Sequence, residues 1–103
     1  MFKITLADAL KALENEGENY SRLLAKDSGD LGFYRPEQVD DQGPHLRDEI
    51  YVVASGHGIF RCGDARTPFA PHDIFFVPRG VEHRFEDFSD EFGVWVIFFG
   101  PSS

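Results

Sequence analysis

The chain has 103 residues, 42% of them hydrophobic and 15% aromatic, and its 18 acidic and 10 basic side chains give a formal net charge of −8. This length and composition are typical of a single globular domain over residues 1–103 rather than of a disordered segment. The negative charge repels phosphate backbones and anionic lipids, so we expect neither nucleic acid nor a membrane as a partner. The single cysteine, Cys62, excludes an internal disulfide, and the sequence shows no signal peptide or membrane span, so we expect a cytoplasmic protein.

The first predicted element is one short amphipathic helix over residues 6–16. Thr5 is placed to cap its start, Asp8 follows three residues later, and Gly17 is placed to stop it. We expect this helix to cover a sheet or a partner chain. Its apolar positions fall at helical spacing and are Leu6, Ala9, Leu10 and Leu13.

After Gly17 the pattern changes to short β-type runs separated by turn-forming residues, which predicts an all-β antiparallel barrel or jelly roll over about residues 20–100. Residues 94–99 are apolar on both strand faces, so we expect the core on one side and a helix or second subunit on the other, which favours a homodimer. The predicted strands lie near residues 20–25, 31–35, 49–54, 57–61, 66–69, 73–77, 83–87 and 92–99.

Metal-binding residue types occur in two segments, in each of which turn-forming residues adjoin a run of β-forming residues. His45 and Glu49 would stand roughly 13 Å apart on a straight strand, too far for one ion, so the chain must turn between them. A hairpin over residues 46–48 would bring His45 back across from Glu49. Period-two alternation places Tyr51 on the same strand face as Glu49.

The second segment presents His83 at the start of a strand, after the turn Pro78-Arg79-Gly80. Together with His45 and Glu49, this histidine would complete two imidazoles and one carboxylate. Such a facial triad leaves about three of six octahedral positions open for other ligands. His57 and His72 lie in turn settings, and we expect both to be exposed.

The segment around His83 resembles the second motif of the cupin superfamily, which reads Gly, five residues, Pro-x-Gly, two residues, His, three residues, Asn. Pro78, Gly80 and His83 match this pattern, whereas His72 stands in the place of the first Gly and Asp87 in the place of Asn.

The segment around His45 resembles the first motif of the same superfamily, which reads His-x-His, three or four residues, Glu, six residues, Gly. His45, Glu49 and Gly56 match, whereas Gly43 occupies the place of the first His. The resemblance extends over about residues 30–100.

The resemblance implies a small jelly-roll barrel that holds a divalent metal ion (Fe, Mn, Ni or Zn) on His45, Glu49 and His83. Gln42, beside the position that lacks its histidine, is either an oxygen ligand or an ordinary turn residue. Asp48 is an alternative carboxylate, but the motif spacing selects Glu49.

Three classes of function fit these features. The first is a metal-dependent enzyme, a dioxygenase, isomerase or lyase, that acts on a small organic molecule, with Tyr51 and Gln42 as candidate proton-handling or orienting groups. The second is a module that binds a small ligand without turnover, and the third is a structural barrel.

Overall fold

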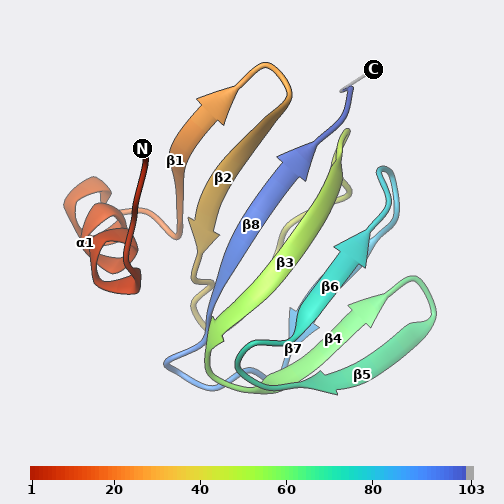
Figure 1. Cartoon of the computed structure of the whole chain (residues 1–103). Coiled ribbons are helices and arrows are strands. Elements are labelled where there is room, and N and C mark those ends of the chain that lie inside the picture. The colour runs from red at the N-terminus through yellow and green to blue at the C-terminus, as the bar shows by residue number, and fades with distance from the viewer. Residues whose placement is uncertain (102–103) are drawn as a thin grey trace.

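The computed structural model describes residues 1–101, in which one helix packs against the larger of two antiparallel sheets (Figure 1). The larger sheet has the strand order β1-β2-β8-β3-β6, and the smaller has the order β5-β4-β7. Each of the eight predicted strands is present, with ends within two residues of the prediction. The elements are α1 (Leu6–Glu16), β1 (Tyr20–Lys26), β2 (Gly29–Tyr34), β3 (Asp48–Ser55), β4 (Gly58–Cys62), β5 (Ala65–Phe69), β6 (Ile74–Val77), β7 (His83–Glu86) and β8 (Gly93–Phe99).

Aromatic side chains fill the space between the two sheets. Phe60 and Phe85 belong to the smaller sheet, and their ring centroids lie 4.7 Å apart, while Tyr51 of the larger sheet lies 4.9 Å from Phe85. Burial of a side chain of this size contributes roughly 1.5–3 kcal/mol. Two facing antiparallel sheets around such a core fit the predicted all-β jelly roll. The buried cluster comprises Tyr51, Val53, Phe60, Phe69, Val77, Phe85, Phe92, Val94 and Val96.

Helix α1 begins at a capping box. The Thr5 hydroxyl accepts a hydrogen bond from the backbone N–H of Asp8, and the Asp8 carboxylate accepts one from the N–H of Thr5, both at 3.1 Å. Gly17 ends the helix in the left-handed conformation, with a φ of 66°. The predicted start and end of this helix are therefore confirmed. Within residues 1–101, no helix has the length and apolar character that crossing a membrane requires.

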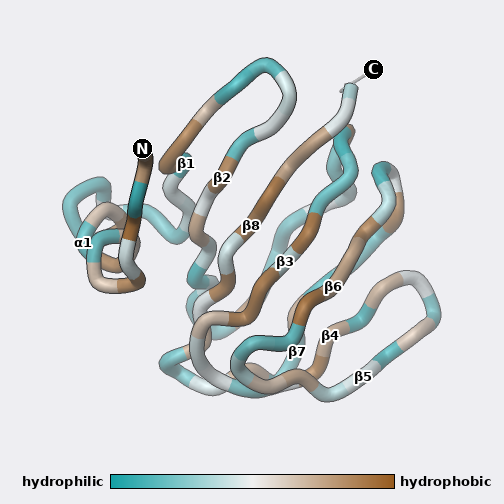
Figure 2. The backbone as a smooth tube through the Cα atoms, in the orientation of Figure 1, coloured by the Kyte–Doolittle hydropathy of each residue, from teal (hydrophilic) through white to brown (hydrophobic). Residues whose placement is uncertain are grey.

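Strand β8 lies in the middle of the larger sheet and is apolar on both faces, as Figure 2 shows by the hydrophobic segments along β8 and β3. Val96 packs in the core, whereas Trp95 contacts Phe33 near α1 at a centroid distance of 5.0 Å. The helix thus covers part of the outer face. Ile74 and Phe76 of β6 are 67% and 55% exposed. The homodimer predicted from residues 94–99 stays a prediction.

The loop between β2 and β3 differs from the prediction. The hairpin expected over residues 46–48 is wrong, because this loop contains no strand that could pair with β3. The loop is held by long-range bonds instead. The N–H of Phe85 donates to the Asp40 carboxylate at 2.9 Å, and the N–H of Gly80 donates to the carbonyl of His45 at 2.8 Å. These contacts, rather than a strand ladder, turn the chain ahead of β3.

The turn between β3 and β4 passes close to Phe92. Gly56 in this turn has a φ of 87°, and a Cβ at this position would lie 2.5 Å from the Cα of Phe92. The left-handed backbone and the close approach both require glycine. These two constraints give a physical reason for the glycine at this position of the first motif.

Replacing Gly56 with alanine is expected to lower the free energy of unfolding by about 2–4 kcal/mol, because roughly 1–2 kcal/mol of left-handed strain adds to a steric penalty of similar size. Gly63→Ala is the matched control, since Gly63 also has a positive φ, 58°, but nothing lies within 4 Å of its Cβ position. It should cost only about 1–2 kcal/mol. Urea denaturation followed by circular dichroism measures both values, and equal losses would contradict the steric explanation.

Candidate metal centre

Glu49 reaches the interior because of its place on β3. This strand lies between β6 and β8, and Glu49 pairs with Val77 of β6 and Phe98 of β8. Alternation along the strand turns Glu49 and Tyr51 toward the space between the sheets, where both are 1% exposed. The predicted shared face of these two residues is confirmed.

His83 comes from the opposite sheet. It is the first residue of β7 and pairs with Cys62 of β4. The preceding turn is tied to the loop that contains His45, because the N–H of Gly80 donates to the carbonyl of His45 at 2.8 Å. A second tie joins the N–H of Arg79 to the carboxylate of Asp48 at 2.9 Å. Asp48 therefore caps this turn and lies apart from the histidines, which leaves Glu49 as the carboxylate between them.

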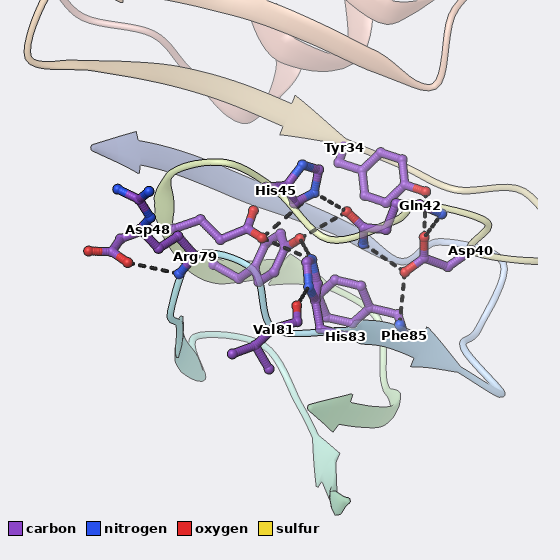
Figure 3. Close-up of polar contacts among 11 residues, drawn as sticks. Tyr34, Asp40, Gln42, His45, Asp48, Arg79, Val81, His83 and Phe85 are labelled. Carbon is purple, nitrogen blue, oxygen red and sulfur yellow. Dashed lines mark hydrogen bonds and ion pairs between the residues drawn. The ribbon is translucent and has the colours of Figure 1, made fainter. Parts of the chain in front are cut away.

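The structure brings together the three residues predicted as metal ligands. Oε1 of Glu49 lies 2.9 Å from Nε2 of His83 and 3.7 Å from Nε2 of His45. All three ligand atoms lie within 4.8 Å of one another. Figure 3 shows His45 and His83 on either side of this space. Ligands about 2.1 Å from one ion and at right angles to it are about 3 Å apart, so the spacing suits a shared cation.

The Glu49 carboxylate is buried without a matching set of donors. Within residues 1–101, its Oε1 faces Nε2 of His83 at 2.9 Å, whereas its Oε2 has no hydrogen-bond partner. A carboxylate taken out of water costs several kcal/mol unless a cation or hydrogen bonds compensate it. This side chain is therefore arranged to face positive charge.

The two histidines respond to Glu49 differently. Burial opposes charge on His83, but the Glu49 carboxylate and the Val81 carbonyl outweigh it and raise the pKa of His83 above the ordinary 6.5. Burial lowers the pKa of His45, and the nearby Glu49 only partly offsets that effect. Nδ1 of His83 lies 2.9 Å from the Val81 carbonyl, to which it donates, so Nε2 faces Glu49. Of the two histidines, His83 is therefore the one that is more readily protonated beside Glu49.

Gln42 and Tyr51 adjoin the three ligands. Oε1 of Gln42 lies 2.9 Å from Nε2 of His45 and accepts a hydrogen bond of 3.1 Å from the Tyr51 hydroxyl. That hydroxyl is also 2.9 Å from Nε2 of His83. Burial, followed by the effect of Glu49, raises the pKa of Tyr51 well above 10, so its phenol stays protonated. Both residues suggested from the sequence as orienting groups lie at the site.

Sequence reasoning missed Asp40, which is 1% exposed and fully hydrogen-bonded. Its carboxylate accepts from the Tyr34 hydroxyl, the backbone N–H and side-chain Nε2 of Gln42, and the N–H of Phe85, at 2.8–3.1 Å. The bond to the N–H two residues ahead is a local turn that an aspartate forms readily, and this was the available signal. The bond to the N–H of Phe85 spans 45 residues, so no pattern in the sequence near Asp40 could have indicated it.

A cavity of about 320 Å³ opens beside the triad and is within the range for small-molecule sites. A larger cleft of about 700 Å³ lies elsewhere, between α1 and residues 35–38, and contains none of the three ligands. His57 and His72 are exposed, as predicted. The lining of the smaller cavity is Tyr20, Tyr34, Gln42, His45, Glu49, Tyr51, Val96 and Phe98.

Two imidazole nitrogens and one carboxylate oxygen suit the borderline divalent ions Fe, Mn, Ni and Zn that the sequence suggested. The buried Glu49 carboxylate, whose Oε2 has no partner among residues 1–101, and the spacing of the three atoms fit such an ion. These observations leave its identity open among the four.

Comparison with known proteins gives consistent results. A family model described as Cupin domain matches residues 34–99. An uncharacterized protein from Streptomyces coelicolor is 33% identical over 104 residues, which cover 99% of this chain and 97% of that protein. Acireductone dioxygenase from Candida albicans is 30% identical over 94 residues, which cover 80% of this chain and 53% of that enzyme. The chain thus spans about half the length of the Candida enzyme.

Solved structures share the fold at low identity. A cupin 2 conserved barrel domain protein from Salinispora arenicola has a TM-score of 0.66 at 20% identity, over 81% of this chain and 76% of that one. The cupin domain of Cnp3 from Schizosaccharomyces pombe has a TM-score of 0.69 at 12% identity, over 81% and 64%. With the match across residues 34–99 and two facing antiparallel sheets, the chain belongs to the cupin family.

Proposed function

We propose that the protein binds one divalent metal ion through His45, Glu49 and His83 and uses it to bind a small organic molecule in the adjoining cavity. The observation that carries this proposal is the buried Glu49 carboxylate, which faces two imidazoles and whose Oε2 has no hydrogen-bond partner within residues 1–101. A divalent cation supplies the charge that this carboxylate otherwise obtains from a proton on His83.

Dioxygenase chemistry is the reaction class that we propose first. Two histidines and one carboxylate are the donor set of many non-haem iron oxygenases, and a metal bound there supplies a Lewis acid with open positions. The name of the Candida relatives, acireductone dioxygenase, supports the same class. In this chain, Tyr51 offers a protonated hydroxyl beside the open side of the triad, where it can donate to a developing negative charge on the substrate.

The second candidate is ligand binding without turnover. Its support is the cavity of about 320 Å³, whose polar and apolar lining can hold a small molecule whether or not a reaction follows. The same scaffold accommodates many unrelated functions.

Metal content tests the ligand assignment. Protein purified without chelator or a nickel column should contain about one divalent ion per chain, and His83→Ala should lose it while keeping its fold, because two ligands hold an ion weakly. His72→Ala is the matched control, since His72 is exposed and distant from the triad in the sequence. Elemental analysis measures all three proteins. Wild-type metal content in His83→Ala would refute the assignment.

Metal affinity should depend on pH. Because the pKa of His83 is raised above 6.5, a proton competes with the metal for Nε2, and affinity should fall as the pH drops through that pKa, by up to about tenfold per unit. Glu49→Gln removes the carboxylate that raises this pKa, so the fall should begin at lower pH. Chelator competition across neutral pH measures both curves. An affinity that does not change with pH would contradict this competition.

Oxygen uptake separates the two candidate functions. Protein loaded anaerobically with Fe²⁺ and then mixed with acireductone and oxygen should consume oxygen faster than His83→Ala treated in the same way. Tyr51→Phe should retain the metal and reduce the rate by about 10²–10³-fold if its hydroxyl stabilises charge in the transition state. Metal and ligand binding with no oxygen uptake would favour binding without turnover.

A further inference from the structure

The side-chain amide of Gln42 has one fixed orientation. Its Nε2 donates to Oδ2 of Asp40 at 2.8 Å, and its backbone N–H donates to Oδ1 of the same carboxylate at 3.1 Å. A carboxylate only accepts hydrogen bonds, so rotating the amide by half a turn would bring two acceptors together. Oε1 of Gln42 therefore points away from Asp40 and toward the triad, as Figure 3 shows.

Asp40 is itself held rigidly. Tyr34 donates to its Oδ1 at 2.8 Å, the N–H of Phe85 donates to its Oδ2 at 2.9 Å, and the side chain is buried. These bonds attach the loop that carries Gln42 to β2 on one side and to β7 on the other. The orientation of the Gln42 amide is thus set before any ion binds, and a preset ligand needs little further ordering.

The position of Gln42 Oε1 suits coordination. It lies 2.9 Å from Nε2 of His45, the same separation as between Oε1 of Glu49 and Nε2 of His83. Neighbouring ligands of one octahedral ion are about 3 Å apart when each is about 2.1 Å from it. When Nε2 of His45 takes a metal it loses its hydrogen, so Gln42 Oε1 keeps the Tyr51 hydroxyl as a donor and has a lone pair free for the ion.

We propose that Oε1 of Gln42 is a fourth protein ligand of the metal, and that Asp40 is the residue that positions it. The proposal rests on the proposed metal site. It assigns to Gln42 the place left by the first motif, where Gly43 stands instead of a histidine. The neutral amide adds no charge, so the carboxylates of Asp40 and Glu49 together balance a divalent ion. About two of six positions then stay open.

The first test uses Co²⁺ alone as the probe, because its visible absorption reports the number and geometry of its ligands. Gln42→Leu should weaken Co²⁺ binding by about tenfold or more and change the spectrum. Gln38→Leu is the matched control, since it makes the same exchange at an exposed position of the same loop and should leave both unchanged. If Gln42→Leu does not fold, Gln42→Asn replaces it. This exchange shortens the side chain by one methylene, which moves the oxygen away from the ion, and it should also weaken Co²⁺ binding and change the spectrum.

A double-mutant cycle tests Asp40. Asp40→Asn should weaken Co²⁺ binding by about tenfold in the wild-type background, because the amide of Gln42 can then turn, but should have little further effect in Gln42→Leu. Equal losses in both backgrounds would reduce Asp40 to a structural residue and overturn its positioning role. Circular dichroism of each variant establishes that the fold is retained.

The outcomes separate the two proposals. Tight Co²⁺ binding by wild type, with the same affinity and spectrum in Gln42→Leu and Gln42→Asn, would overturn the role of Gln42 and leave the three-residue site intact. No Co²⁺ binding by wild type would overturn the metal site and this inference together.

Discussion

The carboxylate of Glu49 is the constraint on which the site depends. The alternation of β3, which lies between two strands of the larger sheet, turns it into an aromatic interior, where it is 1% exposed. A buried charge of this kind is tolerated only beside an opposite charge. The placement of His83, on the facing sheet and 2.9 Å away, follows from that need. The Pro78–Gly80 turn, bonded to the loop of His45, fixes the distance between the two motif segments.

The two buried carboxylates of the site have opposite surroundings. Asp40 accepts four hydrogen bonds, which satisfy most of its capacity and make it a structural centre for the loop between β2 and β3. Glu49 is equally buried, but within residues 1–101 its Oε2 accepts no hydrogen bond and its Oε1 faces Nε2 of His83 at 2.9 Å. Both carboxylates are buried, but only that of Asp40 has a full set of hydrogen-bond donors. Asp40 therefore helps to build the site, whereas the carboxylate of Glu49 is available to a ligand. Motif spacing selects Glu49 from the sequence, whereas the role of Asp40 depends on contacts with Tyr34 and Phe85 that the fold brings together.

The elements could be predicted from the sequence because their signals are local. Alternating apolar residues mark the strands, the pair Thr5 and Asp8 marks the start of α1, and the motif glycine Gly56 marks a turn that admits no Cβ. The loop before β3 could not be predicted, because it is shaped by a bond between Asp40 and Phe85, which lie 45 residues apart. The three ligands were found by motif spacing, whereas the hairpin proposed to unite them was wrong. The sequence predicted that His45, Glu49 and His83 would lie together, but it did not predict the path of the loop that brings His45 to Glu49.

The lining of the cavity restricts what it can hold. Gln42, His45 and Glu49 supply polar lining, whereas Val96 and Phe98 of β8 supply apolar lining, and the ring of Phe98 meets that of His45 edge-on at 5.1 Å. Tyr20 closes another side by lying over Gly32, where a Cβ would come within 2.2 Å of the Tyr20 hydroxyl. A molecule that fits here turns its polar atoms toward the triad and its apolar body toward β8. Whether it is converted or only held then depends on Tyr51, whose hydroxyl is the donor nearest to that polar end.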